Sequence, residues 1–156
     1  MTRRIRTTLP LLVMIGLAPA ALEAQLYKSI GAGVAIPVGD YADSFERGYT
    51  VRAQVGFSLT AVGIHAQAGW SRFPAIQTGD IGLADDDIYH VAAGARVGLG
   101  ILWVGANAGL FGGDDDHDGL AFFPEVGVGL GPLEAVADLR ISGDTRWLGL
   151  RVGLRF

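Results

Sequence analysis

Residues 49–59 read Tyr-Thr-Val-Arg-Ala-Gln-Val-Gly-Phe-Ser-Leu, and this stretch decides the fold. Every odd-numbered position is apolar, whereas the even-numbered positions hold Thr, Arg, Gln, Gly and Ser. Successive side chains of a β-strand point to opposite faces, so a period of two indicates a strand with one apolar and one polar face. A helix would instead spread Arg52 and Gln54 over its apolar surface. The stretch therefore predicts a strand.

The same alternation recurs along the chain. It is clear at 62–71, 89–99, 133–142 and 148–156, and weaker at about 27–36, 101–111 and 120–130. Tight turns are expected near Thr60, Gly100 and Gly131, and they alternate with the connections 37–48, 72–88, 112–119 and 143–145. Eight strands with alternating short and long connections are typical of an antiparallel up-and-down transmembrane β-barrel. The sequence thus predicts an all-β fold.

Acidic residues gather in the longer connections. After position 24, every Asp and Glu lies there except three: Glu125, Glu134 and Asp138. We therefore expect residues 37–48, 72–87, 112–119 and 143–145 to lie together at one end of the barrel, outside the cell. The run Asp85-Asp86-Asp87 is expected to be a solvated part of such a loop.

Composition narrows the class of protein. The 156 residues support one domain, half of them are hydrophobic, and the 24 glycines disfavour long helices. The chain has no Cys, which excludes disulfides and thiolate metal sites. Its net charge of −4 argues against a nucleic-acid partner.

The N-terminal segment has the features of an export signal. Arginines at positions 3, 4 and 6 precede an apolar stretch, residues 9–22, which two prolines and a glycine interrupt. Small residues follow, and Ala24 before Gln25 is the expected cleavage point. We predict a signal peptide at 1–24 and a barrel domain at 25–156; an uncleaved anchor is the alternative.

Two kinds of barrel share this alternation, and they differ in what faces inward. A soluble lipocalin-like barrel, secreted or periplasmic, buries its apolar face and binds a small ligand there. Here the polar face is dominated by glycine, which suits the interior of a narrow barrel better than a surface in water. We therefore expect the apolar face to contact lipid, with the lipocalin-like barrel as the alternative.

Charged residues on the polar face would then lie in the lumen. They are Arg52, Arg96, Glu125, Glu134, Asp138, Arg140, Arg151 and Arg155. Buried charges need partners, so we expect these groups to pair and fill the lumen, leaving no open channel. Glu134 or Asp138 with an arginine of the last two strands is the favoured contact.

The sequence resembles the small eight-stranded outer-membrane barrels of the OmpA-like or OmpX-like type. The resemblance covers 25–156 and rests on the signal peptide, the eight alternating segments, the segment 31–40 and the terminal strand 147–156. It implies a monomer in the outer membrane of a Gram-negative bacterium, in contact with lipid and lipopolysaccharide. It also implies that Phe156 is the terminal aromatic signal read by the barrel-assembly machinery.

One loop carries a possible cation site. The segment Asp114-Asp-Asp-His-Asp-Gly119 followed by Glu125 matches a calcium-loop pattern. Strands rather than helices are expected on both sides, and Glu125 has inward parity. The site would therefore be Asp114, Asp116 and Asp118 binding Ca²⁺ without Glu125; a solvated acidic loop is the other interpretation. No further cofactor is expected.

Enzymatic activity is not expected. An outer-membrane lipid A deacylase needs a Ser and a His together on the lipid-facing side, but His65 and His90 have inward parity and no outward Ser accompanies them. Outward aromatic residues near the longer connections, Tyr49, Trp70, Tyr89 and Phe122, are placed as an interfacial girdle. Trp103 and Trp147 have inward parity: either they pack inside, or the strand register slips there.

Overall fold

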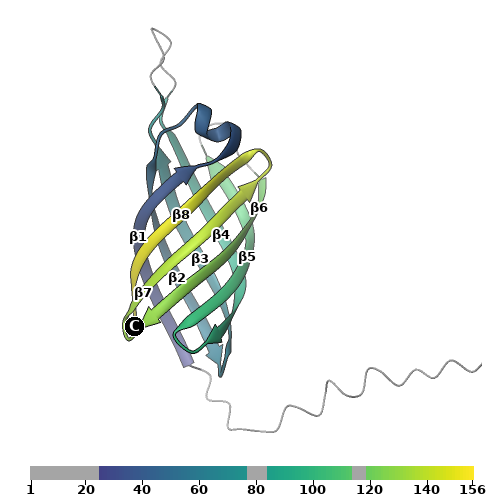
Figure 1. Ribbon diagram of the computed structural model, residues 1–156. Helices are drawn as coiled ribbons and strands as arrows, with labels where there is room; N and C mark the ends of the chain where they lie inside the picture. Colours follow the sequence, from purple (N-terminus) through teal and green to yellow (C-terminus); the bar gives the residue numbers. More distant parts are fainter. Residues whose placement is uncertain (1–24, 77–83, 114–118) are drawn as a thin grey trace, which may run out of the picture.

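The computed structural model describes residues 25–76, 84–113 and 119–156. They form a closed antiparallel barrel in which each strand pairs with its neighbours in the chain and β8 pairs with β1 (Figure 1). The signal peptide expected at 1–24 lies outside the described residues. The elements are β1 (Gln25–Pro37), the 3-10 helix η1 (Gly39–Asp43), β2 (Gly48–Leu59), β3 (Val62–Phe73), β4 (Asp86–Leu99), β5 (Leu102–Gly113), β6 (Gly119–Leu130), β7 (Leu133–Ser142) and β8 (Thr145–Arg155).

The predicted eight-stranded up-and-down barrel is confirmed, and each alternating segment becomes one strand. Two strands begin three residues earlier than expected. β4 begins at Asp86 rather than at residue 89, because Asp86 and Asp87 still pair with Phe73 and Arg72 of β3. β8 begins at Thr145 rather than at residue 148, because its pairing with β7 extends to Ser142. The barrel closes where Ser29–Pro37 of β1 pair with Arg155–Trp147 of β8. Closure leaves no strand with an unpaired edge.

The barrel is apolar outside and largely polar inside. Outward side chains such as Val91 and Leu120 are 64% and 78% exposed, whereas the inward Arg52 is only 3% exposed. This is the reverse of a water-soluble domain, in which charged residues are almost never fully buried. The two faces predicted from the alternation are therefore present, with the apolar one outward.

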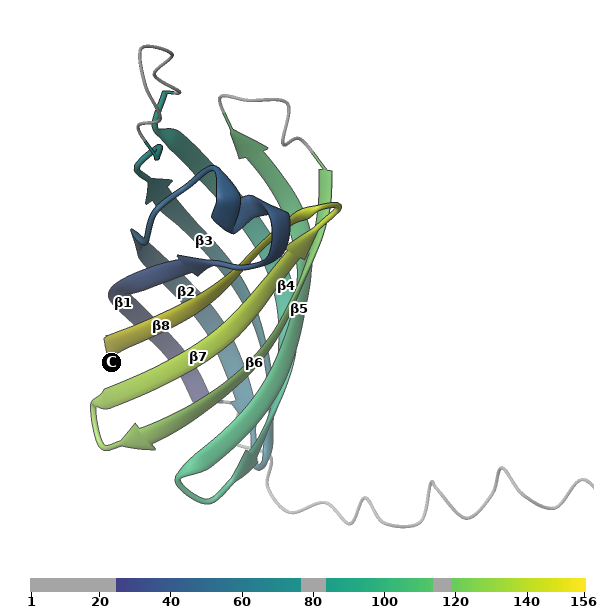
Figure 2. The ribbon, with the colours of Figure 1, turned by 45° about the horizontal axis from the view of Figure 1, so that its top comes forward.

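The two ends of the barrel differ. At one end, called here the turn end, two-residue turns join the strands, and Gly100 and Gly131 take positive φ values of 75° and 63° that favour glycine. The N-terminal end of β1 and the C-terminus lie there (Figure 1). At the other end, the loop end, η1 packs against β8 and β1 (Figure 2). Among the described residues, no helix is long and apolar enough to span a membrane.

Inward glycines lie directly across from large inward side chains. Gly69 pairs with His90, and a Cβ added at Gly69 would lie 2.4 Å from the imidazole. Gly127 pairs with Trp103, and an added Cβ would lie 2.3 Å from the indole. The same relation joins Gly94 to Asn107 and Gly149 to Asp138. Glycine therefore gives the narrow lumen room for its larger side chains.

Candidate functional site

Buried polar residues of the described chain line the lumen, and an ion pair crosses its middle. Arg52 on β2 and Glu125 on β6 meet at 2.7 Å between Nη1 and Oε2, and both side chains are buried. The same Nη1 donates to Gln67 Oε1 at 2.9 Å. Strands β2 and β6 are not neighbours in the sheet, so this contact spans the lumen.

A second cluster surrounds Asp138 on β7. Arg140 Nε donates to Asp138 Oδ2 at 2.7 Å, and Arg151 Nη1 lies 2.5 Å from Asp138 Oδ1 as an ion pair without hydrogen-bond alignment. One buried carboxylate therefore serves two guanidinium groups. Arg140 Nη1 also lies 3.0 Å from His90 Nδ1. An arginine can only donate, so His90 accepts at Nδ1 and its imidazole is neutral.

The three remaining charges that were expected in the lumen do not follow the expected pairing. Glu134 and Arg96 are both buried, at 6% exposed each, yet neither forms an ion pair within the part of the chain that the structure describes. Arg155 has inward parity but lies exposed at the turn end, because it is the last residue of β8. The expected pairing therefore describes Arg52, Glu125, Asp138, Arg140 and Arg151 but not the other three.

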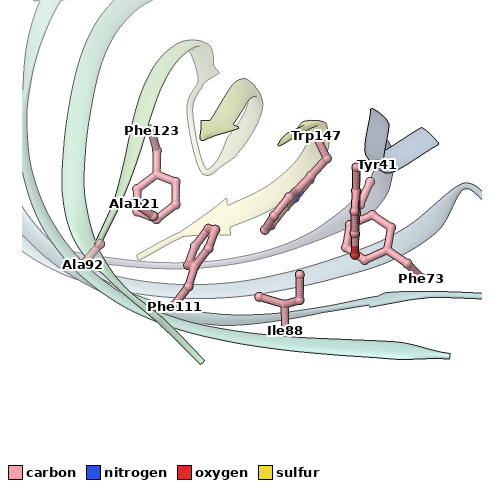
Figure 3. Close-up of a cluster of buried hydrophobic side chains, with 9 residues drawn as sticks. Tyr41, Phe73, Ile88, Ala92, Phe111, Ala121, Phe123 and Trp147 are labelled. Carbon is pink, nitrogen blue, oxygen red and sulfur yellow. The ribbon is translucent and has the colours of Figure 1, made fainter. Parts of the chain in front are cut away.

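Sequence reasoning missed an aromatic plug in the loop half of the lumen. Phe73, Phe111, Phe123 and Trp147 are buried there, and Tyr41 of η1 joins them from above (Figure 3). The Phe111 and Trp147 rings stack at 5.0 Å between centroids. A lumen filled by charges alone is thus an incomplete description. The inward parity of Phe111 and Phe123 was the available signal; Tyr41, in a loop, gave none.

Trp103 and Trp147 both pack inside, so the strand register does not slip. They are 6% and 0% exposed. Trp103 pairs with Gly98 and Gly127 on the neighbouring strands, and Trp147 pairs with Pro37 and Arg140. The period of two therefore holds through both uncertain segments.

The run Asp85-Asp86-Asp87 has three different environments instead of one solvated loop. Asp86 is fully buried and accepts a hydrogen bond of 2.6 Å from the Tyr41 hydroxyl. Asp87 accepts a hydrogen bond of 2.9 Å from the Trp70 indole on the outside of the barrel. Asp85 pairs with Arg72 at 2.9 Å, and this hydrogen bond, with a smaller contribution from the Ala75 amide, lowers the pKa of the Asp85 carboxyl.

The outward aromatic residues lie near the loop-end termini of their strands, with Tyr49, Trp70 and Tyr89 on the neighbouring strands β2–β4 and Phe122 on β6. Tyr49, Tyr89 and Phe122 are 48%, 57% and 49% exposed. Trp70 pairs with Tyr89 across β3 and β4, and its ring meets that of Tyr49 edge to face at 5.4 Å. Amphipathic rings in such a band suit a membrane–water interface.

The predicted cation ligands Asp114, Asp116 and Asp118 lie outside the described residues. In the part that is described, no group of three or more His, Cys, Asp and Glu is arranged to hold a metal ion. Glu125, at the twelfth position of the calcium-loop pattern, is engaged with Arg52 inside the lumen.

The two inward histidines have other partners than a nucleophile. His65 Nε2 lies 2.5 Å from Asn107 Oδ1, and His90 accepts from Arg140. Among the described residues, neither imidazole has a serine as its hydrogen-bond partner. In the part of the chain that the structure describes, His65 and His90 therefore take part in lumen contacts with Asn107 and Arg140.

The fold matches solved transmembrane barrels. The crystal structure of Neisserial surface protein A superposes with a TM-score of 0.61 at 16% identity, covering 85% of this chain and 97% of that one. A chain from the de novo design of transmembrane β-barrels gives 0.56 at 10% identity, covering 83% and 95%. No protein-family model and no curated protein sequence matches the chain. The likeness is one of fold, and at that level the resemblance predicted from the sequence is confirmed.

Proposed function

We propose that the protein is a small integral outer-membrane β-barrel of a Gram-negative bacterium, exported with a signal peptide at 1–24. Its role is structural or surface-interactive rather than enzymatic. The observation that carries this proposal is the inverted polarity of the closed barrel, which has ion pairs inside and apolar side chains outside.

The outward face supports a lipid environment. Its large apolar side chains, among them Leu99, Leu110 and Val152 at 64%, 62% and 63% exposed, continue around the barrel. Soluble monomers rarely expose apolar patches of more than a few hundred Å². A barrel whose apolar band faces lipid has no such difficulty, because closure pairs every strand with two neighbours.

The interior disfavours the lipocalin-like alternative. A barrel that binds an apolar ligand needs an apolar cavity in its middle. Here the middle is occupied by Arg52, Glu125, Arg140 and Asp138, and the loop half by the aromatic plug. These contents also support a lumen without an open channel.

The orientation follows from the loops. We place the loop end outside the cell, where acidic residues such as Asp40 and Asp144 meet the solvent. The acidic connections would contact lipopolysaccharide, whose phosphates share divalent cations with carboxylates. Binding of Ca²⁺ by Asp114, Asp116 and Asp118 is part of this proposal.

Fractionation and labelling test the proposal together. The protein is expected in the outer-membrane fraction, with different gel mobility before and after boiling. Because the chain has no Cys, single cysteines report accessibility: on intact cells a membrane-impermeant maleimide should label Asp144→Cys at the loop end and not Ala61→Cys at the turn end. Both sites are exposed in the structure. Recovery in the soluble periplasmic fraction would favour the lipocalin-like barrel, and the opposite labelling would reverse the orientation.

A further inference from the structure

The turn end of the lumen opens into a pocket that the proposed function does not use. Its volume is about 560 Å³, and its walls include Tyr27, Ser58, Arg96, Trp103 and Arg155. They come from β1, β2, β4, β5 and β8, so the pocket lies around the barrel axis. Below, it is called the mouth pocket.

Arg96 is the central group of the mouth pocket. Its guanidinium carbon lies 3.9 Å from the centroid of the Tyr27 ring and 5.3 Å from that of Trp103. The residue is 6% exposed, and its Nη1 is buried without a hydrogen-bond partner. Within the described residues Arg96 has no ion pair either, unlike Arg52, Arg140 and Arg151. Two aromatic rings hold this cation, but they leave its hydrogen bonds unmade.

Among the described residues, the walls of the mouth pocket carry two arginine side chains and no Asp or Glu side chain. Arg155 lines the same pocket and adds a second guanidinium. The acidic groups near Arg96 are Glu134 and Glu125, and Phe156 brings the C-terminal carboxylate to the rim. Glu125 already pairs with Arg52, and none of the three carboxylates forms an ion pair with Arg96 in the described chain.

We propose that the mouth pocket binds a small oxyanion, a phosphate or a carboxylate, on the guanidinium of Arg96 with Arg155 as the second cation. A planar guanidinium offers parallel N–H donors that match the oxygens of either group. A buried cation without an anionic partner is unfavourable. An anion that enters the pocket would therefore stabilise the Arg96 guanidinium. The oxyanion comes either from a free solute or from a phospholipid headgroup.

Binding can be measured on the protein purified from membranes in a non-ionic maltoside detergent. Inorganic phosphate is titrated at constant ionic strength, with heat of binding and tryptophan fluorescence as readouts. Saturable binding is expected, and the fluorescence change should disappear in Trp103→Phe. Arg96→Gln should weaken binding at least about tenfold, the loss of one charge-assisted contact. Arg155→Gln should weaken it less, and Arg47→Gln, an exposed arginine at the loop end, should bind like the parent.

A folding defect can be separated from a binding defect. Arg96→Lys keeps the positive charge but loses the parallel N–H donors of the guanidinium, so it should bind phosphate with intermediate affinity. Heat-dependent gel mobility shows whether each variant is folded. Repeating the titration in phosphatidylcholine vesicles identifies the source of the anion. Binding in both media indicates a free solute, whereas binding in detergent alone indicates that lipid phosphate already occupies the pocket. Absence of saturable binding in both media, or equal affinity of folded Arg96→Gln, would overturn the proposal. Either result leaves the fractionation test untouched, because the inference does not use the cellular location.

Discussion

At the scale of single residues, the buried charge of Asp138 is the one whose removal should affect stability most. Its carboxylate contacts both Arg140 and Arg151, at 2.7 and 2.5 Å. Asp138→Asn would leave two buried guanidinium groups without an anion, and removing one partner of a buried pair costs about 3–5 kcal/mol. We expect that loss in the free energy of unfolding, measured by urea titration in detergent. Asp144→Asn, at an exposed loop position, is the control and should change it little.

Gly127 tests the space requirement of the lumen. A Cβ added there would lie 2.3 Å from the Trp103 indole, whereas one added at Gly129 on the same strand has nothing within 4 Å. Gly127→Ala should therefore destabilise the barrel by about 1–3 kcal/mol through overpacking, and Gly129→Ala should be nearly neutral. The same urea titration measures both. Equal effects of the two substitutions would contradict the steric explanation.

Asp85 gives a pH-dependent prediction. The hydrogen bond from Arg72 lowers the pKa of its carboxyl in the folded protein. A carboxyl with a lowered folded pKa adds stability above its unfolded pKa, about 3.9, and loses that contribution as the pH falls through the folded value. NMR titration of the Asp85 carboxyl carbon should show a midpoint below the ordinary range. In Arg72→Gln the midpoint should return toward it; an unchanged midpoint would refute the assignment of the cause.

At the scale of elements, β8 is the strand that closes the barrel. Its apolar series ends at Phe156, which is 73% exposed and exchanges two backbone hydrogen bonds with Lys28, at 2.8 and 2.9 Å. We expect Phe156→Asp to reduce assembled protein in the outer membrane far more than the half kcal/mol or so of an ordinary surface change would explain. The measurement is the heat-modifiable band in that fraction, with Phe156→Tyr as the control.

The purified Phe156→Asp chain separates two causes. If it folds in detergent but is not assembled in cells, the residue acts as a recognition signal. If it fails in both, its role is in closing the sheet. Assembly at the level of the unchanged protein would show that the terminal residue has neither role.

Local alternation carries most of the information about the elements. The strand at residues 49–59 is predicted from the period of two alone, and this period can be recognised within one segment without knowledge of the other strands. The contact of Asp138 with Arg140 was also predictable, because both lie on one strand. Arg52 and Glu125 are different: they lie 73 residues apart on non-adjacent strands, so their meeting depends on how the whole barrel is staggered.

The loop end and the mouth pocket were beyond the reach of such local reasoning. Tyr41 enters the plug because η1 packs against β1 and β8, and nothing in a five-residue helical turn signals that placement. The surroundings of Arg96 combine β1, β4 and β5. Both features result from closure of the sheet, which brings together residues that the strand pattern treats separately.

At the scale of the whole molecule, two barriers in series occupy the lumen. The Arg52–Glu125 contact crosses its middle, and the plug around Phe111 and Trp147 fills the loop half. We therefore expect no large, steady single-channel conductance after reconstitution into planar bilayers. The sample is purified protein whose heat-dependent gel mobility shows that it is folded. A porin under the same conditions is the positive control. Stable conductance steps from that sample would show an open lumen.

The pairing of inward glycines with bulky partners has a consequence for how such a chain diverges. Because each glycine makes room for one side chain across the strand boundary, as Gly69 does for His90, a lineage can exchange the two sizes only in concert. Paired exchanges of this kind would change the residues of the interior while keeping its volume. Barrels of one fold can therefore differ widely in their interior residues, and this chain superposes on two solved barrels with which it shares only 16% and 10% of its residues.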